Sequence, residues 1–278
     1  FRTSRINRVN YGIMDLPIYL IIFFLTVIGA SFGSFLNVVI YRVPKKMSII
    51  KPRSHCFSCK APIRALDNIP IIGYFLLGGK CKNCGAEFPS RYAFVEVITA
   101  LLTIIIFVIY GLTNSFLIYL ALVYLLIAIT FVDIDHFIIP NGFILTGLVI
   151  LFLGMQFGWI SIDWIDAASG AFVFAGFLFT IGLIGQFILK KESIGFGDVK
   201  LGLVLGGFLG VEYSILALYL SFALSAVFVF IMLGGKLIKR DAKIPFGPYL
   251  AAGSLISLFT ITPSGDNYIL NWYYLTMF

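Results

Sequence analysis

Long apolar runs separated by short polar breaks fill most of this chain. A helix that crosses the hydrocarbon core of a bilayer needs roughly 20 mostly apolar residues. Runs of this kind lie near 17–41, 92–110, 115–132, 137–157, 166–189, 198–210, 213–233 and 247–263. The sixth run is short and rich in glycine, so it is the weakest of the eight. The pattern predicts an all-α polytopic membrane protein with about eight transmembrane helices.

The composition supports the same class of protein. Hydrophobic residues make up 60% of the 278 residues and charged residues only 12%, which leaves too little polar surface to coat a soluble globule. The net charge of +7 is interpreted as a topology signal that also favours anionic lipid head groups. No nucleic-acid-binding motif accompanies the charge, so we expect the lipid bilayer, and no nucleic acid, as a partner.

The basic residues indicate which loops share one side of the membrane. Of the 20 Lys and Arg residues, ten lie between Arg42 and Arg91, three between Lys190 and Lys200, and four between Lys236 and Lys243. With eight spans, all three stretches fall on the same side. Because cations are retained in the cytoplasm, we expect this side to be cytoplasmic.

The first residues do not follow this pattern. Arg2, Arg5 and Arg8 would lie on the opposite side, and the chain starts with Phe1. A vector-derived or trimmed leader explains both facts, so we interpret residues 1–16 as an N-terminal tail of which about the first 12 are non-native.

Residues 42–91 form the single long polar stretch, which we call the cysteine-rich segment because it contains all four cysteines. Cys56 and Cys59 make one C-x2-C pair and Cys81 and Cys84 another, with 21 residues between the pairs. Two such pairs can place four thiolates on one tetrahedral zinc ion, and a segment of this size needs such a staple to fold. Disulfides, free thiols or a redox dithiol are the alternatives. His55 could replace a cysteine ligand, but a solvated histidine is the preferred interpretation.

Two acidic clusters follow or precede apolar runs on the predicted cytoplasmic side. Asp133 and Asp135 end the third run, and Asp198 precedes the sixth in the string Gly195-Phe196-Gly197-Asp198. Carboxylates at membrane depth are costly, and two that meet can activate a water molecule against a peptide carbonyl. The alternative is that these residues merely cap helices or form ion pairs. Spacing alone does not decide whether Asp133 or Asp135 would join Asp198, and Glu96 is interpreted as a structural polar contact.

The ordered motifs resemble those of the bacterial type IV prepilin leader peptidases, which are GxGD-type aspartyl proteases of the bacterial inner membrane. The resemblance runs from about residue 29 to 253. It rests on Gly33-Ser34-Phe35-Leu36-Asn37 with Arg42 and Pro44, both cysteine pairs, Asp67-Asn68-Ile69-Pro70, Arg91-Tyr92, Val95-Glu96, Asp133-Ile134-Asp135-His136 with Pro140, Gly195-Phe196-Gly197-Asp198-Val199-Lys200-Leu201, and Ile244-Pro245-Phe246-Gly247-Pro248-Tyr249.

The resemblance implies roles for particular residues. Asp133 and Asp198 become the catalytic pair, supported by Asp135, Gly195, Gly197 and Lys200, and the four cysteines become ligands of a structural zinc. It also implies a second activity, the S-adenosylmethionine-dependent methylation of the new N-terminal amine. The expected organisation is a transmembrane helix at 17–41, a zinc-ribbon-like cytoplasmic insertion at 42–91 and a membrane catalytic domain at 92–278. Asn141 departs from the family, because an acid often follows the proline there.

The substrates implied by the resemblance are prepilins and pseudopilins of pili, competence and type II secretion. These have a short basic leader that ends in glycine, followed by a hydrophobic helix that usually starts with phenylalanine. Two other functions stay open at this stage. The aspartates could serve an ion- or proton-coupled transporter, although they lie at helix ends rather than deep within spans. The chain could also be a non-catalytic assembly scaffold that docks through its cysteine-rich segment.

Overall fold

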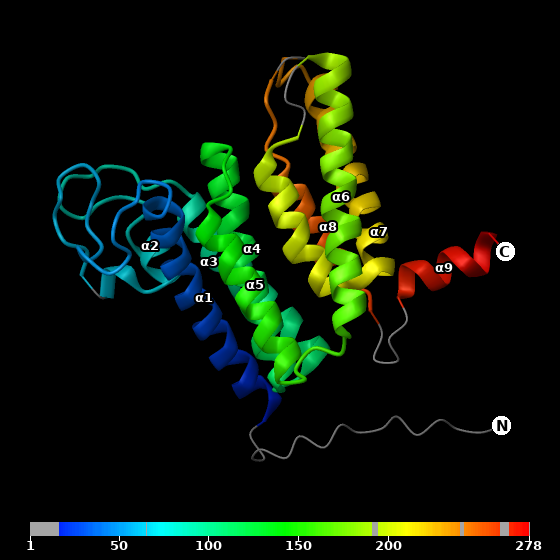
Figure 1. Ribbon diagram of the computed structural model, residues 1–278. Helices are drawn as coiled ribbons and strands as arrows, with labels where there is room; N and C mark the ends of the chain where they lie inside the picture. The colour runs from blue at the N-terminus through cyan, green and yellow to red at the C-terminus, as the bar shows by residue number, and fades with distance from the viewer. Residues whose placement is uncertain (1–16, 65, 191–193, 240–241, 262–266, 278) are drawn as a thin grey trace.

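The computed structural model describes residues 17–64, 66–190, 194–239, 242–261 and 267–277, so the predicted tail at 1–16 lies outside it. The described residues are helical, with isolated bridges but no β-strand (Figure 1). This confirms the all-α fold predicted from the apolar runs. The helices are α1 (Ile18–Arg42), the short 3₁₀ helix η1 (Leu66–Asn68), α2 (Ile72–Leu76), α3 (Arg91–Tyr110), α4 (Asn114–His136), α5 (Asn141–Gln156), α6 (Trp164–Leu189), α7 (Phe196–Gly234), α8 (Gly247–Phe259) and α9 (Tyr268–Met277).

Helices α1, α3, α4, α6 and α7 are long and apolar enough to cross a membrane, whereas α5 and α8 are apolar but shorter. Each of the eight predicted runs corresponds to one of these helices or to a part of one. The sixth and seventh runs both fall within α7. Helix α9 was not predicted.

Helix α7 consists of two arms that meet at Gly210. Its backbone there has φ 70° and ψ −175°, which is not helical and is a conformation that essentially only glycine adopts. Both arms lie beside the same part of α6, since Gly202 of the first arm approaches Ala175 and Phe222 of the second arm contacts Phe177. The chain therefore reverses direction at Gly210, which is why one long helix accounts for two predicted spans.

Helix α4 forms the centre of the fold. It is surrounded by α1, α3, α5 and α8, and it is apolar on all sides. Residues Leu122, Leu126 and Ile129, one helical turn apart, are almost fully buried. The next position in this series is Asp133, so the helix directs that carboxylate into the same buried layer.

Helices α1 and α3 pack closely through two glycines of α1. A methyl group added at Gly29 would lie 2.8 Å from the Ala100 Cα atom, and one at Gly33 would lie 2.7 Å from the Glu96 Cα atom. Small residues four positions apart allow helix backbones to approach in this way. The contact holds the C-terminal half of α1 against the start of α3, where the chain between them forms the cysteine-rich segment.

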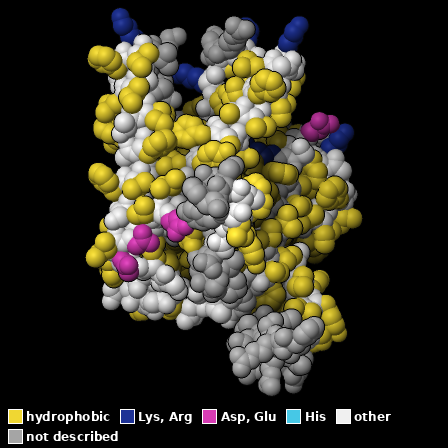
Figure 2. Space-filling view, turned by 90° about the vertical axis from the view of Figure 1, so that its right-hand side faces the viewer, with side chains coloured by type: hydrophobic (Ala, Val, Ile, Leu, Met, Phe, Trp, Pro, Cys, Tyr) yellow, Lys and Arg dark blue, Asp and Glu magenta, His cyan; other side chains and the backbone are white. Residues whose placement is uncertain are grey.

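The outer surface carries many large apolar side chains, and α6 and the second arm of α7 expose several of them, including Phe172, Phe187 and Phe230. Figure 2 shows this side of the molecule, with Lys and Arg at one end and a group of acidic side chains toward the other. In the sequence, Lys190 follows α6 and Asp163 precedes it. Apolar sides with basic residues gathered at one end are typical of a membrane-embedded bundle.

Candidate functional site

Asp133 lies in the last turn of α4 and is only 5% exposed. Its Oδ2 atom accepts a hydrogen bond of 2.9 Å from the backbone N–H of Gly247, the first residue of α8. These residues are 114 positions apart in the chain. A methyl group added at Gly247 would lie 2.8 Å from the same carboxylate oxygen, so a glycine allows the start of α8 to touch Asp133.

Asp198 lies in the first turn of α7 and is 7% exposed. Its Oδ2 atom accepts a hydrogen bond of 3.2 Å from the backbone N–H of Gly195. Asp133 lies close enough to Asp198 for the two carboxylates to interact electrostatically, although they belong to different helices. The structure thus brings together the two aspartates that the sequence singled out.

The start of α7 is held near α4 by Gly197. A methyl group added there would lie 3.2 Å from Cβ and 3.4 Å from Cγ1 of Ile139, which belongs to the short link between α4 and α5. That distance is tighter than ordinary van der Waals contact. The glycine therefore lets the turn that carries Asp198 pack directly on the chain that follows Asp133.

A simple capping role explains only part of this arrangement. The hydrogen bond from Gly195 to Asp198 is of the kind that stabilises a helix start. Capping, however, gives no reason for a second buried carboxylate to lie beside the first, because like charges in a poorly solvated site repel each other. Such a pair lowers stability, so its presence indicates a functional role rather than a structural one.

The other predicted supporting residues, Asp135 and Lys200, have partners of their own. Asp135 is turned away from it and forms a bidentate ion pair with Arg91 at the start of α3. The Lys200 ammonium donates a hydrogen bond of 2.9 Å to the Asn141 side chain at the start of α5 and lies over the Phe196 ring. The hydrogen bond to Asn141 is charge-assisted, because its donor is an ammonium group.

The four cysteines of the cysteine-rich segment lie together, with all four sulfur atoms within 4.8 Å of one another. The Cys56 and Cys84 sulfurs are 3.8 Å apart, and those of Cys59 and Cys81 are 3.9 Å apart. Four sulfurs at about 2.3 Å from a tetrahedral zinc ion are separated by about 3.8 Å. The residues therefore fit a four-cysteine metal site, and the structure contains no disulfide among them.

The two C-x2-C pairs have the same local fold. The Lys60 N–H bonds the Cys56 carbonyl and the Gly85 N–H bonds the Cys81 carbonyl, and both Lys60 and Gly85 have positive φ. In this turn the Cys59 amide, which points at the sulfur, lowers the pKa of Cys56. For Cys84 the Ala86 amide lowers the pKa, but desolvation and the three neighbouring thiols together raise it to about 11. Amides directed at sulfur are typical of metal-binding knuckles.

Two contacts at the site were not predicted as such from the sequence. The Gly247 amide reaches Asp133 from a distant part of the chain, and the only signal for it was the motif Pro245-Phe246-Gly247-Pro248. The partner of Asp135 is Arg91, which the sequence offered only as part of a short motif. Glu96, interpreted as a structural contact, accepts a hydrogen bond of 2.6 Å from the Ile71 N–H.

The sequence matches two family models along most of its length. Residues 27–110 match the bacterial peptidase A24 N-terminal domain, and residues 120–230 match the type IV leader peptidase family. A Legionella pneumophila protein named prepilin leader peptidase/N-methyltransferase is 34% identical over 270 residues, which cover 87% of this chain and 90% of that protein. A Pseudomonas putida protein of the same name is 32% identical over 256 residues, with coverages of 84% and 88%. No solved structure gives a significant match.

Proposed function

Because the chain belongs to the type IV leader peptidase family, we propose that it is a membrane aspartyl endopeptidase that removes the leader of type IV prepilins or pseudopilins. The observation that carries the proposal is the pairing of Asp133 and Asp198. Both are buried, each is held by a glycine amide, and they interact across two helix ends in an otherwise apolar bundle.

The chemistry follows from two carboxyl groups that share one proton. The ionised carboxylate takes a proton from a water molecule, whose oxygen attacks the scissile carbonyl, while the protonated carboxyl donates its proton to the carbonyl oxygen. The Gly247 and Gly195 amides fix one oxygen of each carboxyl group. Because the groups are oriented before the substrate arrives, little reorganisation is needed during the reaction.

The position of the pair suits a substrate with a basic leader. Both aspartates lie at helix ends on the side of the bundle that carries the cysteine-rich segment, and we assign this side to the cytoplasm. A leader rich in Lys and Arg is retained on that side, while the apolar helix behind it enters the bilayer. The scissile bond after glycine then lies at the interface where the aspartates are.

The cysteine-rich segment supplies the second half of the proposed function. Cys56, Cys59, Cys81 and Cys84 would hold a zinc ion that staples this segment, and the ion's role there is structural. We assign to the enzyme the methylation of the newly exposed N-terminal amine, with S-adenosylmethionine as the methyl donor, in keeping with the names of its relatives.

Mass spectrometry of a processed prepilin tests both activities together. The full chain, purified in detergent, is incubated with a prepilin with and without S-adenosylmethionine. We expect loss of the leader after its terminal glycine in both reactions, and a gain of one methyl group only with the donor. An uncleaved prepilin in the presence of folded, zinc-containing protein would contradict the proposal and leave a transporter or an assembly scaffold.

A further inference from the structure

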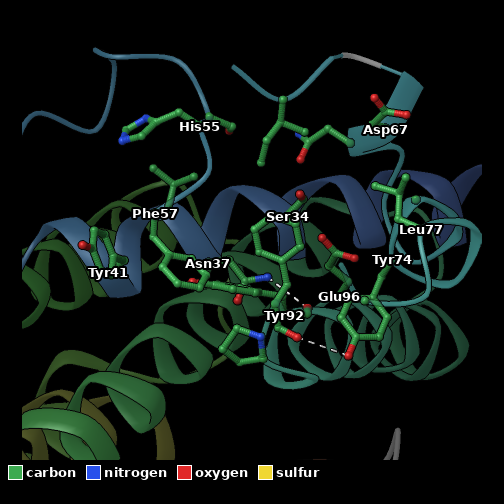
Figure 3. A pocket seen from close by; sticks show the side chains of 18 of the residues that line it. Ser34, Asn37, Tyr41, His55, Phe57, Asp67, Tyr74, Leu77, Tyr92 and Glu96 are labelled. Atoms are coloured by element: carbon green, nitrogen blue, oxygen red, sulfur yellow. Dashed lines mark hydrogen bonds between the residues drawn. The ribbon is translucent and has the colours of Figure 1, made fainter. Parts of the chain in front are cut away.

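A cavity of about 460 Å³ lies beneath the cysteine-rich segment, apart from the aspartate pair. Its floor is the C-terminal half of α1 and the start of α3, and its roof is the chain around the cysteines and α2. Figure 3 shows Asn37, Tyr92 and Glu96 on the helices, with His55 and Phe57 from the segment above and Tyr74, also from the segment, beside Tyr92 and Glu96. The volume falls within the roughly 300–1,000 Å³ that is usual for small-molecule sites.

One polar group in this cavity lacks a partner. Asn37 is 7% exposed, and its Nδ2 atom donates a hydrogen bond of 3.0 Å to the Tyr92 carbonyl. Its Oδ1 atom is buried and accepts no hydrogen bond from the protein. A buried acceptor without a donor is destabilising. The side chain is thus fixed at one end, and its other end is an acceptor that the protein leaves without a donor.

The backbone at the cavity wall is held in an unfavourable conformation. Ile71 has φ 64°, which is a genuine outlier for a β-branched residue, and its N–H donates to the Glu96 carboxylate. Glu96 is 8% exposed. Strain of this kind persists where the surrounding structure enforces it and is concentrated at binding sites. Here the Glu96 carboxylate pins the segment that follows Pro70 over the cavity.

The remaining walls combine aromatic rings with acidic groups. Tyr41, Phe57, Tyr74 and Tyr92 all contribute to the lining, as do the carboxylates of Asp67 and Glu96. Aromatic faces accept a flat heterocycle by stacking and attract a cation through their negative faces. Lys60, also in the lining, offers a positive charge to a ligand carboxylate.

We propose that this cavity is the binding site for S-adenosylmethionine, an inference that rests on the methyltransferase half of the proposed function. The ligand carries a flat purine, N–H and O–H donors, a sulfonium cation and a carboxylate. The cavity offers aromatic faces, the free Asn37 oxygen, two carboxylates and a lysine. Each chemical feature of the ligand therefore has a complementary group in the lining.

The cavity lies close in the fold to the site of cleavage. Tyr92 and Glu96 line it, and the neighbouring Arg91 pairs with Asp135, two residues from Asp133. In the transfer, the nitrogen lone pair of the unprotonated pilin amine forms a bond to the methyl carbon as the carbon–sulfur bond breaks. The electron pair stays on sulfur to give S-adenosylhomocysteine, and the extra proton on nitrogen passes to water.

Direct binding measurements test the assignment. Radiolabelled S-adenosylmethionine is titrated into the purified full chain in detergent, and its affinity is compared among the wild type, Asn37→Leu and Phe57→Ala. We expect each variant to bind roughly tenfold or more weakly, which corresponds to the loss of one good hydrogen bond or stacking contact. Phe57 is half-exposed, so its truncation leaves the fold intact even if Asn37→Leu does not.

A buried polar residue outside the cavity provides the matched control. The Thr103 hydroxyl of α3 forms a hydrogen bond with the Tyr124 hydroxyl of α4. Thr103→Val should therefore lower stability, while the affinity for S-adenosylmethionine stays at the wild-type value. Wild-type affinity in both cavity variants, with methylation intact in the wild type, would overturn the cavity assignment and leave the proposed function standing. A wild-type chain that cleaves prepilin but neither methylates it nor binds the ligand would instead contradict the methyltransferase half, and the cavity assignment with it.

Discussion

At the scale of single residues, the contacts of the aspartates are set by glycines. Gly247 exposes the amide that holds Asp133, and Gly197 lets the turn of Asp198 rest on Ile139. Side chains at these positions would separate the elements that carry the two carboxylates. Because distances within a catalytic pair must be kept to a fraction of an ångström, the motif Gly195-Phe196-Gly197-Asp198 can be explained by packing as well as by chemistry.

Gly197→Ala should therefore slow cleavage as well as lower the stability of the protein. The added methyl group would lie 3.2 Å from the Ile139 Cβ atom, and relieving such overpacking costs about 1–3 kcal/mol. If that strain displaces Asp198, the cleavage rate falls roughly 10- to 100-fold. Gly176→Ala on α6 is the control, because nothing lies within 4 Å of its added methyl group. Equal rates for the two variants would mean that this contact does not position Asp198.

At the scale of secondary structure, the turn within α7 is stabilised from a neighbouring helix. The Asp166 side chain of α6 accepts a hydrogen bond of 3.1 Å from the Val211 N–H, immediately after Gly210. It acts as an N-cap for the second arm, supplied by another helix rather than by the chain just before it. The contact links α6 to the second arm of α7 at the end of the bundle opposite the aspartates.

Asp166→Ala should lower the free energy of unfolding by about 1 kcal/mol, which is the usual value of an N-cap. Thermal unfolding in detergent measures this, with the exposed Glu212→Gln as a control for the loss of an acidic side chain at the same turn. A melting temperature for Asp166→Ala equal to that of the control would show that the cap contributes nothing.

At the scale of the whole molecule, two bodies of different chemistry meet at one end of the bundle. The membrane helices are stabilised by apolar packing, whereas the cysteine-rich segment has four sulfurs arranged for a metal. Arg42 joins the two, because its guanidinium donates to the Ser48 and Pro52 carbonyls in the cysteine-rich segment. Loss of the metal should consequently affect the segment and its cavity before it affects the helices.

We expect about one zinc per chain by elemental analysis of freshly purified, reduced protein. Cys59→Ser and Cys84→Ser should lose the metal and make residues 42–90 sensitive to proteases, with methylation falling more than cleavage. Ser58→Ala, in the same knuckle, should keep it. Zinc-free wild-type protein with full methylation would refute the metal site.

The sequence predicted the helices and the aspartates for clear physical reasons, and it missed contacts that only folding creates. Apolar runs are local features of the sequence, so all eight could be recognised, and each lies in a helix, including the two arms of α7. Asp133 and Asp135 could not be distinguished by pattern because α4 is apolar on all sides. The structure separates them, since Asp133 shares the layer of Ile129 whereas Asp135 pairs with Arg91. The unpaired Asn37 oxygen likewise depends on a contact between α1 and α3, because the Asn37 amide bonds Tyr92, which lies 55 residues further along the chain.

Cleavage by the three aspartate variants tests the central claim most directly. Asp133→Asn, Asp198→Asn and Asp135→Asn are each incubated with a prepilin, and their fold is verified by methylation of a supplied mature pilin with a free phenylalanine amine. We predict no detectable cleavage by Asp133→Asn or Asp198→Asn, because the pair needs one ionised and one protonated carboxyl. Asp135→Asn should retain cleavage at a reduced rate. Cleavage by Asp133→Asn together with inactive Asp135→Asn would contradict the assignment of the catalytic pair.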